Sequence, residues 1–71
     1  MSYYDMGLEK VRFLESFKGK ASSVENIRSN CDGYIECLFD ASLISEGEWS
    51  TLTCELQRAY EHAKEVSKNW E

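Results

Sequence analysis

Apolar residues recur at helical spacing along most of the chain, and few residues interrupt the pattern. Proline is absent and glycine occurs only 4 times, while Val, Ile and Thr never alternate over the length of a strand. Gly19 lies where a first helix should end, and Gly47 falls in the first turn of a last helix. The sequence therefore predicts an all-α protein with three helices.

The second and third predicted helices, which begin near Ser22 and Ser45, are amphipathic when successive residues are placed about 100° apart. The connections around Gly19 and around residues 43–44 are short, so neighbouring helices must run antiparallel. The predicted fold is a small three-helix bundle, or a hairpin of the second and third helices with the first packed across it. The two apolar stripes consist of Val24, Ile27, Cys31, Tyr34, Ile35, Leu38 and Ala41, and of Trp49, Leu52, Leu56, Ala59, Tyr60, Ala63, Val66 and Trp70.

Residues 22–25 and 45–48 both match the capping-box pattern, in which a Ser or Thr is followed three residues later by Glu. Ile44 and Trp49 flank the second box at the positions of a hydrophobic staple. A weaker match at residues 2–5 would begin the first helix almost at the terminus, with an acid in its first turn. These signals predict where the three helices begin.

The first predicted helix, residues 3–18, has an apolar arc too wide for one core. Met6, Phe13 and Phe17 lie up to about 180° away from Tyr4 on a helical wheel. In one interpretation, the other two helices wrap around this helix and cover the whole arc. In the other, Met6, Phe13 and Phe17 form an exposed patch for a second copy or a partner, so that the protein forms a homodimer.

Length and composition indicate one small globular domain that spans residues 1–71. The chain has 71 residues, of which 42% are hydrophobic and 30% charged. A core of this size rarely supplies more than about 3–5 kcal/mol without a metal, disulfides or a partner. The N-terminal residues lack the apolar segment of a secretory signal, and no stretch reaches the ~18–20 apolar residues that cross a bilayer. We therefore expect a cytoplasmic protein that does not associate with membranes.

The sequence gives little support for catalysis, for a metal or for another cofactor. His62 falls on the outer face of the third helix, two turns beyond Cys54, so the two cannot meet within one helix. Cys31 and Cys37 are too far apart around their helix to form half of a zinc site. Cys31 is expected to act as a small buried apolar group. The interpretation is a protein that is not an enzyme.

Acidic residues concentrate in the middle of the chain. The net charge is −5 overall, and it is +1 over residues 1–20, −5 over residues 21–48 and −1 over residues 49–71. This balance opposes direct binding to nucleic acid, whose affinity comes mainly from Lys and Arg. The acids form either an ordinary solvated face or a docking surface for a protein partner with a basic surface. The candidate partner-binding residues are Glu25, Asp32, Glu36, Asp40, Glu46 and Glu48.

Two functions are compatible with these patterns. The first is a small regulator or inhibitor that docks on a larger basic protein, including one that handles nucleic acid, with the acids in the extreme case imitating backbone phosphates. Its size and charge are similar to those of many inhibitors encoded by phages or plasmids, including DNA mimics. The alternative is a homo-oligomeric structural or adaptor subunit that associates through its first helix. The two differ in salt dependence, because charge-mediated docking weakens with salt and an apolar interface does not.

Overall fold

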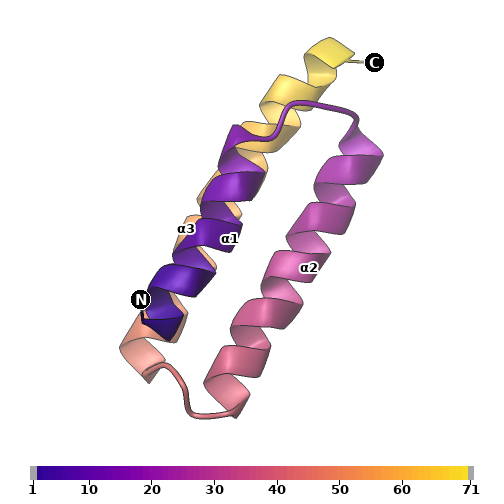
Figure 1. Cartoon of the computed structure of the whole chain (residues 1–71). Helices are drawn as coiled ribbons and strands as arrows, with labels where there is room; N and C mark the ends of the chain where they lie inside the picture. Colours follow the sequence, from indigo (N-terminus) through magenta and orange to yellow (C-terminus); the bar gives the residue numbers. More distant parts are fainter. Residues whose placement is uncertain (1, 71) are drawn as a thin grey trace.

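The computed structural model describes residues 2–70 and consists of three helices that run alternately up and down (Figure 1). They are α1 (Tyr3–Ser16), α2 (Ala21–Asp40) and α3 (Glu46–Ser67), and a short 3-10 turn, η1 (Lys68–Trp70), extends α3. Helix α1 packs against both α2 and α3, which confirms the predicted small helical bundle. The bundle is elongated, with extents of 40 × 19 × 15 Å. No helix in the described part of the chain has the length and apolar character needed to span a membrane.

Two of the three predicted capping boxes are present. The Ser2 hydroxyl accepts a hydrogen bond of 3.1 Å from the Asp5 N–H, and the Ser45 hydroxyl accepts one of the same length from the Glu48 N–H. In both boxes the acid reaches back to the backbone N–H of the serine. These reciprocal bonds satisfy N–H groups that the first turn of a helix leaves without a partner, and they fix where α1 and α3 begin.

The capping box predicted at residues 22–25 is wrong. Helix α2 begins at Ala21, and its N-cap is Lys20, which makes no side-chain hydrogen bond to the helix. The Lys20 carbonyl accepts hydrogen bonds of 3.1 Å from the N–H groups of Ser23 and Val24, so Ser22 already lies inside the first turn. The boundary follows from the linker, because the extended backbone at Phe17 and at Lys20 brings the chain onto α2 two residues earlier than the sequence pattern indicates.

The core lies between the inward faces of all three helices and follows the predicted stripes. Ala41 and Trp70, which were predicted to continue the stripes, are exposed instead, because Ala41 lies beyond the end of α2 and Trp70 lies in η1. A Cβ atom at Gly7 would lie 2.8 Å from Leu52 Cδ1, so this glycine lets the α1 backbone come close to α3. The buried hydrophobic residues are Val11, Leu14, Val24, Cys31, Ile35, Leu38, Ile44, Leu52, Leu56, Ala59 and Ala63.

Helix α2 ends in a Schellman motif that reverses the chain toward α3. Ser42 has φ = 60°, in the left-handed region where glycine is usual. The Ser42 N–H donates to the Phe39 carbonyl at 3.0 Å, and the Leu43 N–H donates to the Leu38 carbonyl at 2.9 Å. This turn places Ile44 in the core just before the cap of α3, so α2 and α3 are connected by a short and well-defined loop.

Candidate functional site

Charge is segregated along the long axis of the bundle. No Lys, Arg or His precedes Lys10 or lies between Arg28 and Arg58. Figure 1 shows that the start of α1 and the α2–α3 connection lie at one end, while the α1–α2 connection and the end of α3 lie at the other. The antiparallel helices therefore bring residues 2–9 and 29–57 together in what we call the acidic half. Its charged residues are Asp5, Glu9, Asp32, Glu36, Asp40, Glu46, Glu48 and Glu55.

Three of the six acids predicted to bind a partner form contacts within the fold. Glu36 Oε1 accepts a hydrogen bond of 3.0 Å from Trp49 Nε1, and Glu48 belongs to the α3 capping box. Glu25 lies outside the acidic half, where it accepts a hydrogen bond from the Tyr60 hydroxyl. These three carboxylates therefore contribute to the local structure of the bundle.

The other three predicted acids are free. Asp32, Asp40 and Glu46 are exposed, and within residues 2–70 none of them makes a side-chain hydrogen bond or an ion pair. Asp32 and Asp40 are two helical turns apart on α2, about 12 Å along its axis, and Glu46 follows on the first turn of α3. Of the six acids predicted to bind a partner, these three are therefore exposed and unpaired.

The charges at both ends of α2 oppose the helix dipole. Its first turn has no acid and follows Lys20, whereas its last turn has no base and ends at Asp40. A charge of the unfavourable sign near a helix terminus costs about 0.3–1 kcal/mol at an exposed site. Asp40 is thus an exposed carboxylate at a position where helix stability alone disfavours it.

Aromatic and cationic side chains form contacts between α2 and α3 at two places along these helices. Phe39 stacks on Trp49 with ring centroids 5.0 Å apart, and the Arg28 guanidinium lies 4.7 Å from the centroid of the Tyr60 ring. Lys64 approaches the same ring at 5.0 Å. The hydrogen bond to Glu25 raises the pKa of the Tyr60 hydroxyl above its usual value, because it stabilises the protonated form. Sequence reasoning missed the contact of Phe39 with Trp49 and the contacts around Tyr60, since each joins residues from different helices.

The three residues predicted for self-association differ in exposure. Phe13 is 58% exposed, whereas Met6 and Phe17 are half-buried, and Phe17 packs against the core. The Phe13 and Phe17 rings are in contact, with centroids 6.2 Å apart. The exposed part of the predicted patch is therefore concentrated at Phe13.

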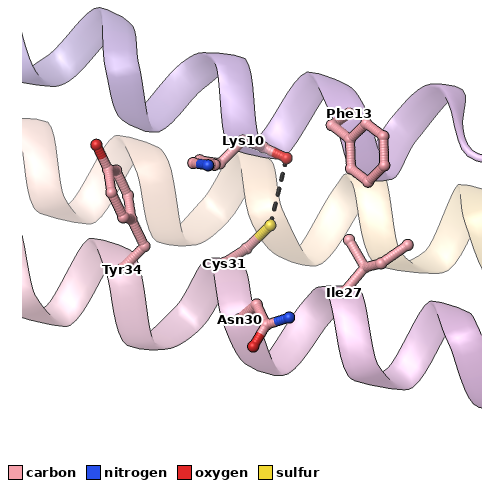
Figure 2. A pocket seen from close by; sticks show the side chains of 6 residues that line it. All are labelled: Lys10, Phe13, Ile27, Asn30, Cys31 and Tyr34. Atoms are coloured by element: carbon pink, nitrogen blue, oxygen red, sulfur yellow. Dashed lines mark hydrogen bonds between the residues drawn. The ribbon is translucent and has the colours of Figure 1, made fainter.

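A hollow of about 360 Å³ lies beside Phe13, between α1 and α2 (Figure 2). Cys31 lies at this hollow, and its Sγ donates a hydrogen bond of 3.3 Å to the Lys10 carbonyl. Burial raises the pKa of the Cys31 thiol, so it stays protonated at neutral pH. The residues that line the hollow are Lys10, Phe13, Ile27, Asn30, Cys31 and Tyr34.

Within residues 2–70, no three His, Cys, Asp or Glu side chains are grouped so that they could hold a metal ion. Cys37 and Cys54 are exposed and unpaired among the described residues. The chain matches no protein-family model, and no curated protein or solved structure matches it either. The functional argument therefore depends on the charge and the surfaces of the bundle.

Proposed function

We propose that this protein is a non-enzymatic regulator or inhibitor that docks its acidic half on a basic surface of a larger protein. The observation that supports this function is the set of unpaired, exposed carboxylates of Asp32, Asp40 and Glu46 in a half that contains no basic residue. A region of one charge sign attracts a partner of the opposite sign and accelerates their encounter.

The position of Asp40 favours docking over simple solvation. An acid that only keeps the protein in solution is equally effective anywhere on the surface, whereas Asp40 lies at the helix end where the dipole disfavours it. A basic partner would reverse this cost, because its charge stabilises both the carboxylate and the negative end of α2. The same consideration makes α2 and the first turn of α3 the centre of the proposed contact.

The proposed partner is a basic protein surface, including that of a protein that handles nucleic acid. Imitation of a continuous row of phosphates receives less support, because Glu36 is held by Trp49 and interrupts the row between Asp32 and Asp40. Separate carboxylates on α2 and α3 instead suit a few discrete Lys or Arg side chains, which Arg in particular would bind with two parallel hydrogen bonds.

The test compares two variants with the same net charge. In the first, Asp32→Asn, Asp40→Asn and Glu46→Gln neutralise the free carboxylates of the acidic half. In the matched control, Glu15→Gln, Glu61→Gln and Glu65→Gln neutralise three exposed acids elsewhere on the bundle. Partners are identified by quantitative pull-down from the source cell with each form as bait, and the association rate of a purified partner is then measured at low and high salt.

We expect the acidic-half variant to lose the partner and the control to keep it. The loss should appear mainly as a slower association rate at low salt, because exposed charges act chiefly by steering the encounter. High salt should reduce the difference between wild type and variant, since it screens exposed charges. Equal binding by the two variants at low salt would contradict the proposal and leave the acids as a solvated face.

A further inference from the structure

The exposed surface of α2 on the side of the hollow contains no charged residue. Asn26, Asn30, Gly33 and Cys37 are all exposed and fall within about 60° of one another around the helix. The charged residues of α2 lie outside this arc, although 30% of the whole chain is charged. Together with Phe13 and the hollow beside it, these four residues form what we call the α1–α2 face.

The α1–α2 face has the composition of an interface core. Charged residues are depleted and aromatic residues enriched at the centre of protein–protein interfaces, and Phe13 is 58% exposed beside the uncharged arc of α2. Lys10, which is charged, also lines the hollow at this face. A Cβ atom at Gly33 would meet nothing within 4 Å, so the backbone of α2 is open to close approach there. A projecting ring beside a hollow is also a self-complementary shape, as a two-fold dimer requires.

The size of the molecule restricts how such a contact is made. Stable interfaces bury about 800 Å² of each partner, and the largest projection of this bundle measures only 40 × 19 Å between Cα atoms. An interface of standard size must therefore extend along most of the length of the molecule. Both its acidic and its basic parts come into contact with the partner, and the charge pattern decides which partner fits.

The charges along α1 are complementary to those of a second α1 that runs in the opposite direction. Asp5 and Glu9 lie in the first half of α1, whereas Lys10 and Arg12 lie in the second half, and Lys18 follows the helix. Glu15 also lies in the second half, but it is about 160° from Phe13 around the helix and therefore outside the face. If a second copy runs antiparallel with its Phe13 opposite the Phe13 of the first, Glu9 of each copy lies opposite Phe17 of the other, next to Lys18. A parallel pairing would instead place like charges together, which costs free energy.

We propose that the α1–α2 face binds a second copy of this chain in an antiparallel, two-fold symmetric dimer, with the Phe13 ring of each copy entering the hollow of the other. Asp32 and Asp40 lie outside the uncharged arc of α2, and Glu46 lies on α3. The dimer therefore leaves Asp32 and Glu46 free to dock on a basic partner, whereas Asp40 borders the arc about 20° from Gly33. The two proposals are tested by different variants.

The first test uses Gly33→Arg, with Gly33→Ala as the matched control. Because an added side chain at Gly33 meets open space, both variants are expected to fold at least as well as wild type. Sedimentation under reducing conditions, which prevent disulfides through Cys37, should show a dimer for wild type at micromolar concentration. Gly33→Arg should raise the dissociation constant by about tenfold or more, because it introduces a bulky charge at the contact. A monomeric wild type, or an unchanged dissociation constant in Gly33→Arg, would overturn the proposal and leave the face open to a different protein.

The second test addresses the antiparallel orientation by charge reversal. Glu9→Lys and Lys18→Glu should each weaken the dimer, because each places like charges near one another. The double variant should restore the wild-type dissociation constant, since it exchanges the signs across the two-fold axis. Salt should weaken the wild-type dimer, because it screens the attraction between the acidic residues of each copy and the basic residues of the other. A dimer that salt strengthens, or a double variant weaker than both single variants, would overturn the antiparallel arrangement.

Discussion

The indole N–H of Trp49 donates a hydrogen bond of 3.0 Å to Glu36 Oε1 and thereby joins the first turns of α3 to the last turns of α2. The same indole ring stacks on Phe39 with the two planes 26° apart. Glu36 is half-buried at this contact, whereas Asp32, its neighbour in the predicted acidic row, is exposed. One of the two carboxylates thus supports the fold, and the other is free to interact outside it.

Removal of the Glu36 acceptor should destabilise the bundle. We expect Glu36→Ala to lower the free energy of unfolding by about 1 kcal/mol, because the indole N–H is left without a partner at a partly buried position. Glu36→Gln should cost less, since its amide oxygen can still accept the bond. Urea denaturation followed by Trp fluorescence measures both, with Asp32→Ala as the exposed control. A loss for Asp32→Ala equal to that for Glu36→Ala would contradict the assignment.

Two of the serines at predicted capping boxes should respond differently to replacement by alanine. Ser45→Ala should lower the free energy of unfolding by about 0.5–2 kcal/mol, because the Glu48 N–H loses its acceptor. Ser22→Ala should be neutral or slightly stabilising, since Ser22 lies inside the first turn of α2 and alanine has the higher helix propensity. Chemical denaturation midpoints distinguish the two variants. A loss of similar size at Ser22 would indicate that Ser22 caps α2, as the sequence pattern predicts.

The start of α2 is a position where the protein can be stabilised. Lys20 has the extended backbone of an N-cap, with φ = −70° and ψ = 151°, but offers no capping acceptor. Lys20→Asp should raise the free energy of unfolding by about 1 kcal/mol, because it adds an acceptor for the free N–H groups and a favourable charge at the positive end of the helix. Thermal unfolding is the measurement. Lys20→Glu makes the same charge change at the same position with a side chain that is not a favoured N-cap, and an equal effect there would show that charge alone is responsible.

Two helical glycines should respond to alanine with opposite signs. At Gly7 the new methyl group would meet Leu52, which is fully buried and has little room to move, so we expect a net loss on the order of 1 kcal/mol. At Gly33 the methyl group meets open space, and the higher helix propensity of alanine should give a gain of about 0.5–1 kcal/mol. Urea denaturation of both variants compares the signs, and stabilisation at Gly7 would mean that α1 can move away from α3.

The thiol of Cys31 should react more slowly than those of Cys37 and Cys54. It is buried with a raised pKa, while the other two are exposed, so a thiol reagent at mildly alkaline pH should show a fast and a slow phase. Cys31→Ala should remove only the slow phase. Because the folded pKa lies above the unfolded one, the associated stability is present below the ordinary thiol pKa and is lost as pH rises from there through the raised folded pKa. A slow phase that survives in Cys31→Ala would contradict this assignment.

The accuracy of the sequence predictions depends on how local each interaction is. The boxes at Ser2 and Ser45 were predicted correctly because a capping box involves residues only three positions apart. The box at Ser22 failed because the extended linker ends at Lys20, two residues earlier, which places Ser22 inside the first turn of α2. The pairing of Glu25 with Tyr60 joins residues 35 positions apart, and no periodicity in either helix indicates it.

The sequence by itself determined the number of helices, their approximate bounds and the residues that face the core, because helical periodicity and capping act over one or two turns. Only the tertiary structure decided which acids remain free, since the distance between α2 and α3 determines that Trp49 reaches Glu36 while Asp32 and Asp40 stay unpaired. It also decided where charge accumulates. Residues 2–9 and 29–57 are separate in the chain, and the antiparallel packing of the three helices brings them together in one half of the bundle.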